Sequence, residues 1–178
     1  MKNKTLWKSL KADFETNHGA FPAKIGEWAK VDGPIKCCHK GFHASKRAVD
    51  AMRFVDCEII ALVEVRGESD HEKDKSAHAE MRILKAYKWT KRDSVELAIF
   101  AAEQVIEIYE KKYPKDDRPR KAIEAAKNWL KNPTAAADAA YAAAADAFAA
   151  AADAAAEKIL DKCEDFIQAK IKTLEAVK

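Results

Sequence analysis

The spacing of hydrophobic positions changes near residue 90, and this change predicts two kinds of structure along the chain. Before it, short apolar runs are punctuated by glycine and proline, since residues 5–44 hold four of the five glycines and two of the five prolines. Such punctuation is typical of short strands joined by turns. After it, apolar residues recur at helical spacing. We predict an α+β fold, with a small α/β module at residues 1–89 and a helical module at residues 90–178.

Residues 58–66 form the clearest strand in the first module. They are rich in β-branched side chains and apolar enough for the centre of a short mixed or antiparallel sheet. We expect residues 68–75 to form a charged loop after this strand. Residues 76–89 fit both a helix and a strand, and we favour the strand. Ser45 is a candidate N-cap of a short helix that follows it.

Capping and proline positions divide the second module into a bundle of three helices. Asp93 with Glu96 resembles a capping box, so the first helix is expected to begin there and to end before Pro114. Pro119 suits the first turn of a second helix. The expected inner face of the first helix consists of Leu97, Phe100, Ala101, Val105, Ile108 and Tyr109.

The third helix is predicted over residues 134–156, which are mostly alanine. Alanine is the best helix former, and its small side chain lets a neighbouring helix come close. At about 100° per residue, Asp138, Asp146 and Asp153 share one face of this helix. This stripe is either a solvated face or a surface that docks a partner. The candidate binding residues on it are Ala143, Asp146, Ala150 and Asp153.

Composition and charge narrow the possible classes of function. The chain has 178 residues, of which 48% are hydrophobic and 34% charged, as in ordinary globular proteins. Its net charge of +3 gives no strong electrostatic footprint for DNA. The three aspartates would make the alanine-rich segment costly to insert into a bilayer, and the basic N-terminus does not lead into an apolar run. We therefore expect a cytoplasmic protein that does not bind membranes.

The densest set of potential metal ligands is the segment Cys37-Cys38-His39-Lys40-Gly41-Phe42-His43. A structural zinc site needs four ligands, usually grouped as two close pairs. A second pair would have to come from Cys57, His71 or His78, and their spacing does not match. We predict no metal and no cofactor, and we interpret the segment as a tight turn with Phe42 in the core and His43 hydrogen-bonded. The four cysteines are expected to be reduced and mostly buried.

A nucleotide-handling pocket is an alternative use of the same turn. His43 could act as an acid or a base, with Glu64 and Arg66 on the central strand surrounding a ligand. The order of strand, turn, helix and strand resembles small ADP-ribosyltransferase-like folds. No clear nucleophile or independent acidic partner accompanies these residues, so we favour a protein that is not an enzyme.

A second candidate binding segment lies between the first two helices of the helical module. Arg118 and Arg120 flank Pro119 there and could hold phosphate or carboxylate. The alternative is a solvated loop in which Asp116 or Asp117 pairs with an arginine.

Two family resemblances follow the same division of the chain. The segment Cys-His-Lys-Gly-Phe-His-Ala at residues 38–44, the strand at 61–67 and Asp74-Lys75 together resemble a phage- and prophage-associated domain of unknown function, over residues 5–89. Residues 102–105, 113–114 and 117–126 with Trp129 are similar to an immunity protein family, over residues 92–156. The second resemblance implies a binding role, because that family is associated with toxins. Lys127 stands where arginine would be expected.

Together the resemblances imply a phage or mobile-element accessory protein in the cytoplasm of a bacterial host. The predicted function is to bind a host protein stoichiometrically and to inhibit or modulate it, the host protein being either a toxin or a host-defence enzyme such as a CRISPR nuclease. A nucleotide-handling enzyme in the first module is one alternative, and a nucleic-acid-binding accessory protein is another, since nucleic acid could also be reached through the partner. The lysines available for direct nucleic-acid binding are Lys8, Lys11, Lys24, Lys30, Lys36 and Lys40. The oligomeric state is not predicted.

Overall fold

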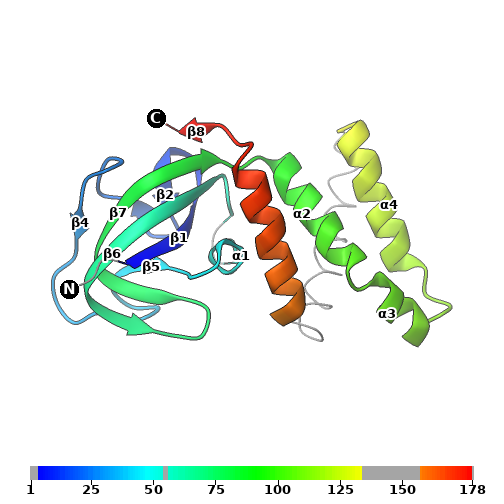
Figure 1. Cartoon of the computed structure of the whole chain (residues 1–178), viewed down its shortest axis with the longest axis horizontal. Helices are drawn as coiled ribbons and strands as arrows, with labels where there is room; N and C mark the ends of the chain where they lie inside the picture. Colours follow the sequence, from blue (N-terminus) through cyan, green and yellow to red (C-terminus); the bar gives the residue numbers. More distant parts are fainter. Residues whose placement is uncertain (1–3, 54–55, 134–156, 178) are drawn as a thin grey trace. The chain divides into compact units, whose positions relative to one another are not determined.

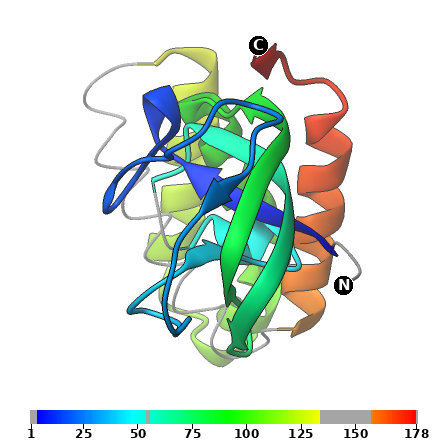
Figure 2. The same cartoon turned by 90° about the vertical axis from the view of Figure 1, so that its left-hand side faces the viewer.

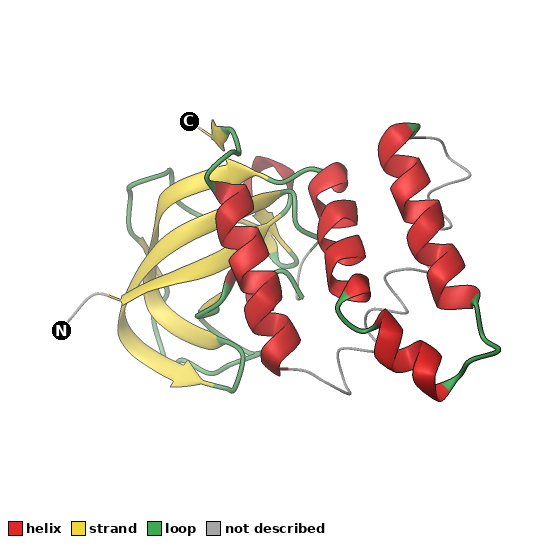
Figure 3. Ribbon diagram, turned by 45° about the vertical axis from the view of Figure 1, so that its right-hand side comes forward, coloured by secondary structure: helices red, strands yellow, loops and turns green. Residues whose placement is uncertain are grey.

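The computed structural model describes residues 4–53, 56–133 and 157–177, which form two compact units (Figure 1). The first unit comprises Met1–Thr90 together with Gln168–Lys178, and the second comprises Lys91–Ile167. The first unit contains an antiparallel sheet and the second contains helices, so the predicted α+β class is confirmed (Figure 3). The predicted alanine-rich helix at residues 134–156 lies outside the described residues, as do Ala143, Asp146, Ala150 and Asp153.

A long hairpin of β6 (Ile59–His71) and β7 (Ser76–Lys88) is the centre of the sheet, and its two strands run side by side in Figure 2. Strand β1 (Lys4–Leu10) pairs with β6 along its outer edge. The other edge of β7 is covered in turn by β5 (Phe42–Ala44), β4 (Ala29–Lys30) and β8 (Ala176–Val177). The remaining short elements are η1 (Ala12–Phe14), β2 (Glu15–Thr16), β3 (Gly19–Ala20) and α1 (Ala48–Ala51).

Both main strand predictions are confirmed, but the structure corrects their bounds. Strand β6 continues to His71, so the predicted charged loop at residues 68–75 begins only after that residue. The continuation depends on an irregularity between Arg66 and Ser69, where Gly67 has a φ of +83°. The N-cap prediction is wrong, because Ser45 is bonded through its backbone to Trp7 and α1 begins only at Ala48.

The sheet buries alternate residues of its three longest strands. Leu6 and Leu10 of β1 lie opposite Val63 and Ile59 of β6, and all four are buried. Residues two apart on a strand share a face, so Lys8 lies on the same buried face between the two leucines. Its side chain is 9% exposed. The core of the first unit therefore contains a lysine.

Three helices of the second unit are described in full, and part of a fourth. They are α2 (Lys91–Glu103), α3 (Ile106–Lys112), α4 (Arg118–Lys131) and helical residues from 157 to 171, of which those up to Ile167 belong to this unit. Helices α2, α3 and α4 share a core that contains Val95, Ile99, Ala102, Ile106, Ile123, Ala126 and Trp129. Phe100 and Phe166 also stack, with ring centroids 4.8 Å apart.

The structure corrects the predicted single helix over residues 93–112. The chain tightens after Ala101, where Gln104 and Val105 donate backbone hydrogen bonds to the carbonyls of Ala101 and Ala102. Helix α3 then begins at Ile106. The capping box is also wrong, since α2 begins at Lys91 and Asp93 lies buried in its first turn. Pro119 does lie in the first turn of α4, as predicted.

No helix among the described residues is both long enough and apolar enough to cross a membrane.

Candidate protein-binding site

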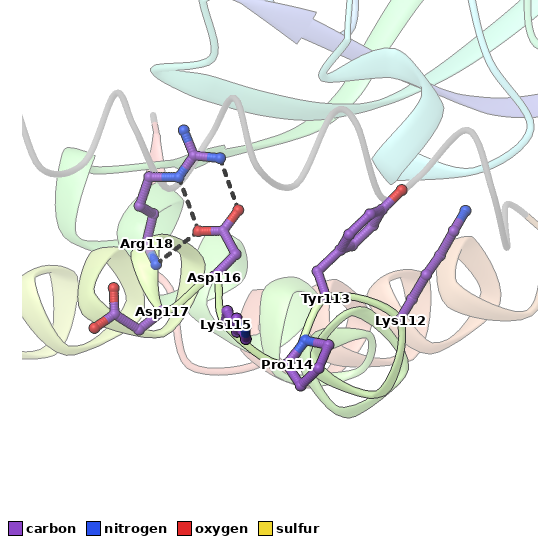
Figure 4. Close-up of a pocket in the computed structure, with 7 residues that line it drawn as sticks. All are labelled: Lys112, Tyr113, Pro114, Lys115, Asp116, Asp117 and Arg118. Carbon is purple, nitrogen blue, oxygen red and sulfur yellow. Dashed lines mark hydrogen bonds and ion pairs between the residues drawn. The ribbon is translucent and has the colours of Figure 1, made fainter.

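The connection between α3 and α4 is exposed and held by its own hydrogen bonds and ion pairs, and we call it the α3–α4 elbow (residues 106–121). Pro114 follows the end of α3, where the Tyr113 N–H still bonds to the Tyr109 carbonyl at 2.8 Å. The Asp116 N–H then bonds to the Tyr113 carbonyl at 3.0 Å, which closes a turn before α4. An open hollow here is lined by Lys112, Tyr113, Pro114, Lys115, Asp116, Asp117 and Arg118 (Figure 4).

Asp116 is the centre of the hydrogen bonding in the elbow. Its two oxygens accept the Arg118 guanidinium at 2.8 and 2.7 Å, as the dashed lines in Figure 4 show. The Tyr109 hydroxyl donates to the same carboxylate at 2.8 Å. The Arg118 guanidinium, and next the Tyr109 hydroxyl, hold the pKa of Asp116 well below its usual range. A bidentate pair fixes the plane of a guanidinium, so Arg118 is oriented although its side chain is 85% exposed.

A second bidentate pair joins the two helices of the elbow. Arg120 in the first turn of α4 donates to Glu110 of α3 at 2.5 and 2.6 Å. Lys121 also pairs with Asp117, one helical turn earlier, at 2.7 Å. The structure thus brings both predicted binding arginines, Arg118 and Arg120, into one connection, and each is held by a carboxylate of the chain itself.

The most exposed large hydrophobic side chains of the described residues are both in the elbow. Ile108 is 64% exposed and Tyr113 is 46% exposed. The Tyr113 ring packs against Tyr109 at 4.9 Å between centroids, and the Lys112 ammonium lies 5.3 Å from the Tyr113 ring. Tyrosine and arginine are enriched among the residues that dominate binding energy at protein interfaces. A supported tyrosine beside an oriented arginine is therefore suited to binding a protein.

Ile108 was expected on the inner face of the first helix, and this expectation is wrong. Helix α2 is apolar on two stripes, and the expectation follows from extending the stripe that contains Leu97 and Val105. The core instead uses the stripe of Val95, Ile99, Ala102 and Ile106. Continued at about 100° per residue, that stripe leaves Ile108 on the opposite side of α3. The helical phase therefore identifies Ile108 as exposed only once the packed stripe of α2 is known from the structure.

Glu64 and Arg66 lie on one face of β6, opposite Arg82 and Glu80 of β7. Arg82 donates to Glu64 at 2.5 Å, and Arg66 donates to Glu80 at 2.8 Å. Trp28 packs over both ion pairs, with the guanidinium carbons of Arg66 and Arg82 at 3.9 and 4.9 Å from the centroid of its ring. The two cross-strand ion pairs and the indole over them stabilise the sheet, so Glu64 and Arg66 have a structural role.

The structure places His43 apart from Glu64 and Arg66. His43 is opposite Ala77 on β7, whereas Glu64 is opposite Arg82, so they lie roughly 15 Å apart along the strand. The His43 Nε2 accepts the backbone N–H of Cys38 at 2.9 Å. Burial, and then the charges of Lys8 and Lys75, lower the pKa of His43. The ring is therefore a neutral acceptor that fixes the turn before it.

Substitution His43→Ala should lower the free energy of unfolding by about 1–2 kcal/mol, because the Cys38 N–H loses its acceptor and a half-buried ring is lost. Urea unfolding followed by circular dichroism would measure this change. Partner binding, by contrast, should be unchanged at temperatures where the variant is folded. A variant that is fully stable but inactive would instead assign His43 a chemical role.

The cysteines of the turn, Cys37 and Cys38, form no disulfide. All four cysteines of the chain are free, with Cys37 and Cys163 buried, Cys57 half-buried and Cys38 exposed. Within the ranges that the structure describes, no group of three His, Cys, Asp or Glu side chains could hold a metal ion. Phe42 packs on Phe21 at 5.5 Å between ring centroids, at the edge of the core. Phe42 and His43 therefore both have a structural explanation in this segment.

The amino-acid sequence matches two protein families, which divide the chain near residue 90. Residues 4–92 match a family described as a domain of unknown function, DUF7666, and residues 85–174 match one described as Imm-5 like putative immunity protein. The chain belongs to both families. Both resemblances expected from the sequence are thereby confirmed, and the α3–α4 elbow lies within the immunity-like part. A search of curated proteins found no match, and a search of solved structures found none either.

Proposed function

We propose that this chain is a stoichiometric inhibitor that binds a toxin protein through the α3–α4 elbow. The observation that carries the proposal is the membership of residues 85–174 in an immunity-like family. The elbow supports it, since it combines exposed Ile108 and Tyr113 with an arginine held in place by Asp116. A surface that is ordered before binding loses less conformational entropy when the partner arrives.

Binding is favoured over catalysis by the state of the candidate catalytic residues. His43 uses its Nε2 as an acceptor within the turn, and Glu64 and Arg66 form cross-strand ion pairs. A general base needs a free acceptor within reach of the proton that it abstracts. A host-defence enzyme such as a CRISPR nuclease is a narrower form of the same proposal, in which the inhibited protein is a nuclease of the host.

Growth rescue tests the proposal. Each protein encoded beside this chain is expressed alone, and those that stop bacterial growth are co-expressed with it. We expect rescue for at least one of them, and purified proteins should show inhibition that is complete at one chain per toxin. Neutralisation by far less than one chain per toxin would indicate an enzyme, and the absence of any neutralised protein would contradict an immunity role.

Replacing Tyr113 tests whether the toxin contacts the elbow or another part of the surface. Tyr113→Ala is expected to weaken inhibition about thirty-fold, as at an interface hot spot, while Tyr113→Phe keeps the ring and should inhibit normally. The measurement is an inhibition curve against purified toxin for both variants. If Tyr113→Ala inhibits as well as the unaltered chain, the contact lies elsewhere.

A further inference from the structure

We infer that the α3–α4 elbow binds an acidic segment of the partner protein, in which carboxylates flank an apolar side chain. This inference rests on the proposed function and adds the chemistry of the surface that the elbow recognises. It follows from which charges of the elbow are neutralised inside the chain and which are not.

Ion pairing within the elbow neutralises most of its carboxylates but leaves three lysines unpaired among the described residues. Three ion pairs form within the elbow, namely Arg118–Asp116, Arg120–Glu110 and Lys121–Asp117. Lys111, Lys112 and Lys115 form no ion pair with the described residues. Glu107 is the carboxylate that this pairing leaves over, so positive charge dominates the solvent-facing groups of the elbow.

Each of the two exposed apolar side chains has lysines near it. Ile108 lies on the exposed side of α3, one helical turn before Lys111 and Lys112. Lys112 continues across the ring of Tyr113, and Figure 4 shows the two side chains extending together beside the hollow. Lys115 lines the same hollow. An apolar side chain flanked by ammonium groups is complementary to an apolar side chain flanked by carboxylates.

An acidic protein segment fits this surface better than a nucleic acid does. Both arginines of the elbow are already bonded on two nitrogens to carboxylates, so a phosphate would have to compete with Asp116 or Glu110. Ile108 would gain nothing from a sugar–phosphate backbone, whereas it can pack against an aliphatic side chain. The lysines therefore steer and orient an acidic partner around apolar anchors.

Amide NMR of the full chain tests the inference with defined probes. These are a short peptide of leucine and glutamate, the same peptide with glutamine in place of glutamate, and a short single-stranded DNA. We expect the acidic peptide to shift the amides of residues 107–118, with weaker binding as salt rises. Replacing Lys111, Lys112 and Lys115 with glutamine should weaken this binding about ten-fold.

The matched control replaces Lys24, Lys36 and Lys40 with glutamine, since these lysines are also exposed and belong to the first unit. The control should bind the acidic peptide like the unaltered chain. Equal binding of the glutamine peptide, shifts outside the elbow, or no binding would overturn the inference. Tighter binding of the DNA at the same amides would overturn it in favour of nucleic acid. Toxin neutralisation without acidic-peptide binding refutes this inference alone, whereas peptide binding without neutralisation refutes the proposed function alone.

Discussion

Replacing Lys8 with methionine should stabilise this protein by about 3–4 kcal/mol at neutral pH, an unusually large gain for one substitution. Lys8 points into the core of the sheet between Leu6 and Leu10. Its ammonium donates to the His43 carbonyl at 2.9 Å. Burial lowers the pKa of Lys8 from 10.5 to about 8, and at about 1.4 kcal/mol per pH unit this corresponds to the stated cost of folding with the charge buried. Methionine has a similar shape without the charge.

The pH dependence provides a separate test of the same substitution. Between about pH 8 and 10.5 the unfolded chain keeps the Lys8 proton that the folded chain has released, so the stability of the unaltered protein should rise with pH there. Below pH 8 both states are protonated and the full cost remains. The Lys8→Met variant should lack this rise.

Chemical unfolding at several pH values measures both effects. Lys4→Met is the matched control, because Lys4 is an exposed lysine of the same strand and should change stability little. A Lys8→Met variant that is less stable than the unaltered chain would mean that the hydrogen bond to His43 outweighs the burial of the charge.

Gly41→Ala should destabilise the first unit by about 2–4 kcal/mol, enough to unfold many small domains at physiological temperature. Gly41 has a φ of +121°, which side-chain-bearing residues rarely adopt. A Cβ added there would also lie 3.0 Å from Ile35 Cγ2, 3.2 Å from the Ala77 Cβ and 3.3 Å from the backbone nitrogen of His78. Strain and crowding therefore act together at this position.

Gly26→Ala separates the two causes. Gly26 has a φ of +89°, but a Cβ added there would have no neighbour within 4 Å. Its loss of stability should be about 1 kcal/mol, from strain alone. Thermal unfolding of both variants gives the comparison, and equal losses would show that crowding at Gly41 is relieved by small shifts of Ile35 and Ala77.

The α+β fold class and the turn at residues 37–43 could be predicted because both depend on the local order of apolar, glycine and proline residues. The β-branched run at residues 58–66 and the glycine spacing before it are visible without knowledge of any partner. The local sequence does not show which charged side chains will form ion pairs with one another. Glu64 faces Arg82 and Arg66 faces Glu80 only because the hairpin register places them opposite one another, so their roles as ion pairs required the structure.

The candidate site was predicted in part. The positions of Arg118 and Arg120 around a proline identify them from the sequence, and the pairing of Asp116 with an arginine is one of the two arrangements that the sequence allows. The exposed anchors Ile108 and Tyr113 were missed because α2 has two apolar stripes and the sequence does not say which one faces α4. Tertiary packing decides between such stripes, and it also decides which residues of α3 remain in solvent.

Strand β8 has a consequence for the order in which the protein can fold. It pairs with β7 through Ala176 and Val177, which the ribosome makes roughly ninety residues after the rest of that sheet. The helices of the second unit are therefore synthesised while the edge of β7 at Ala86 and Tyr87 still lacks its last strand. During synthesis that edge offers unpaired backbone groups to other chains, and the risk of misassociation ends only when Ala176 and Val177 have been made.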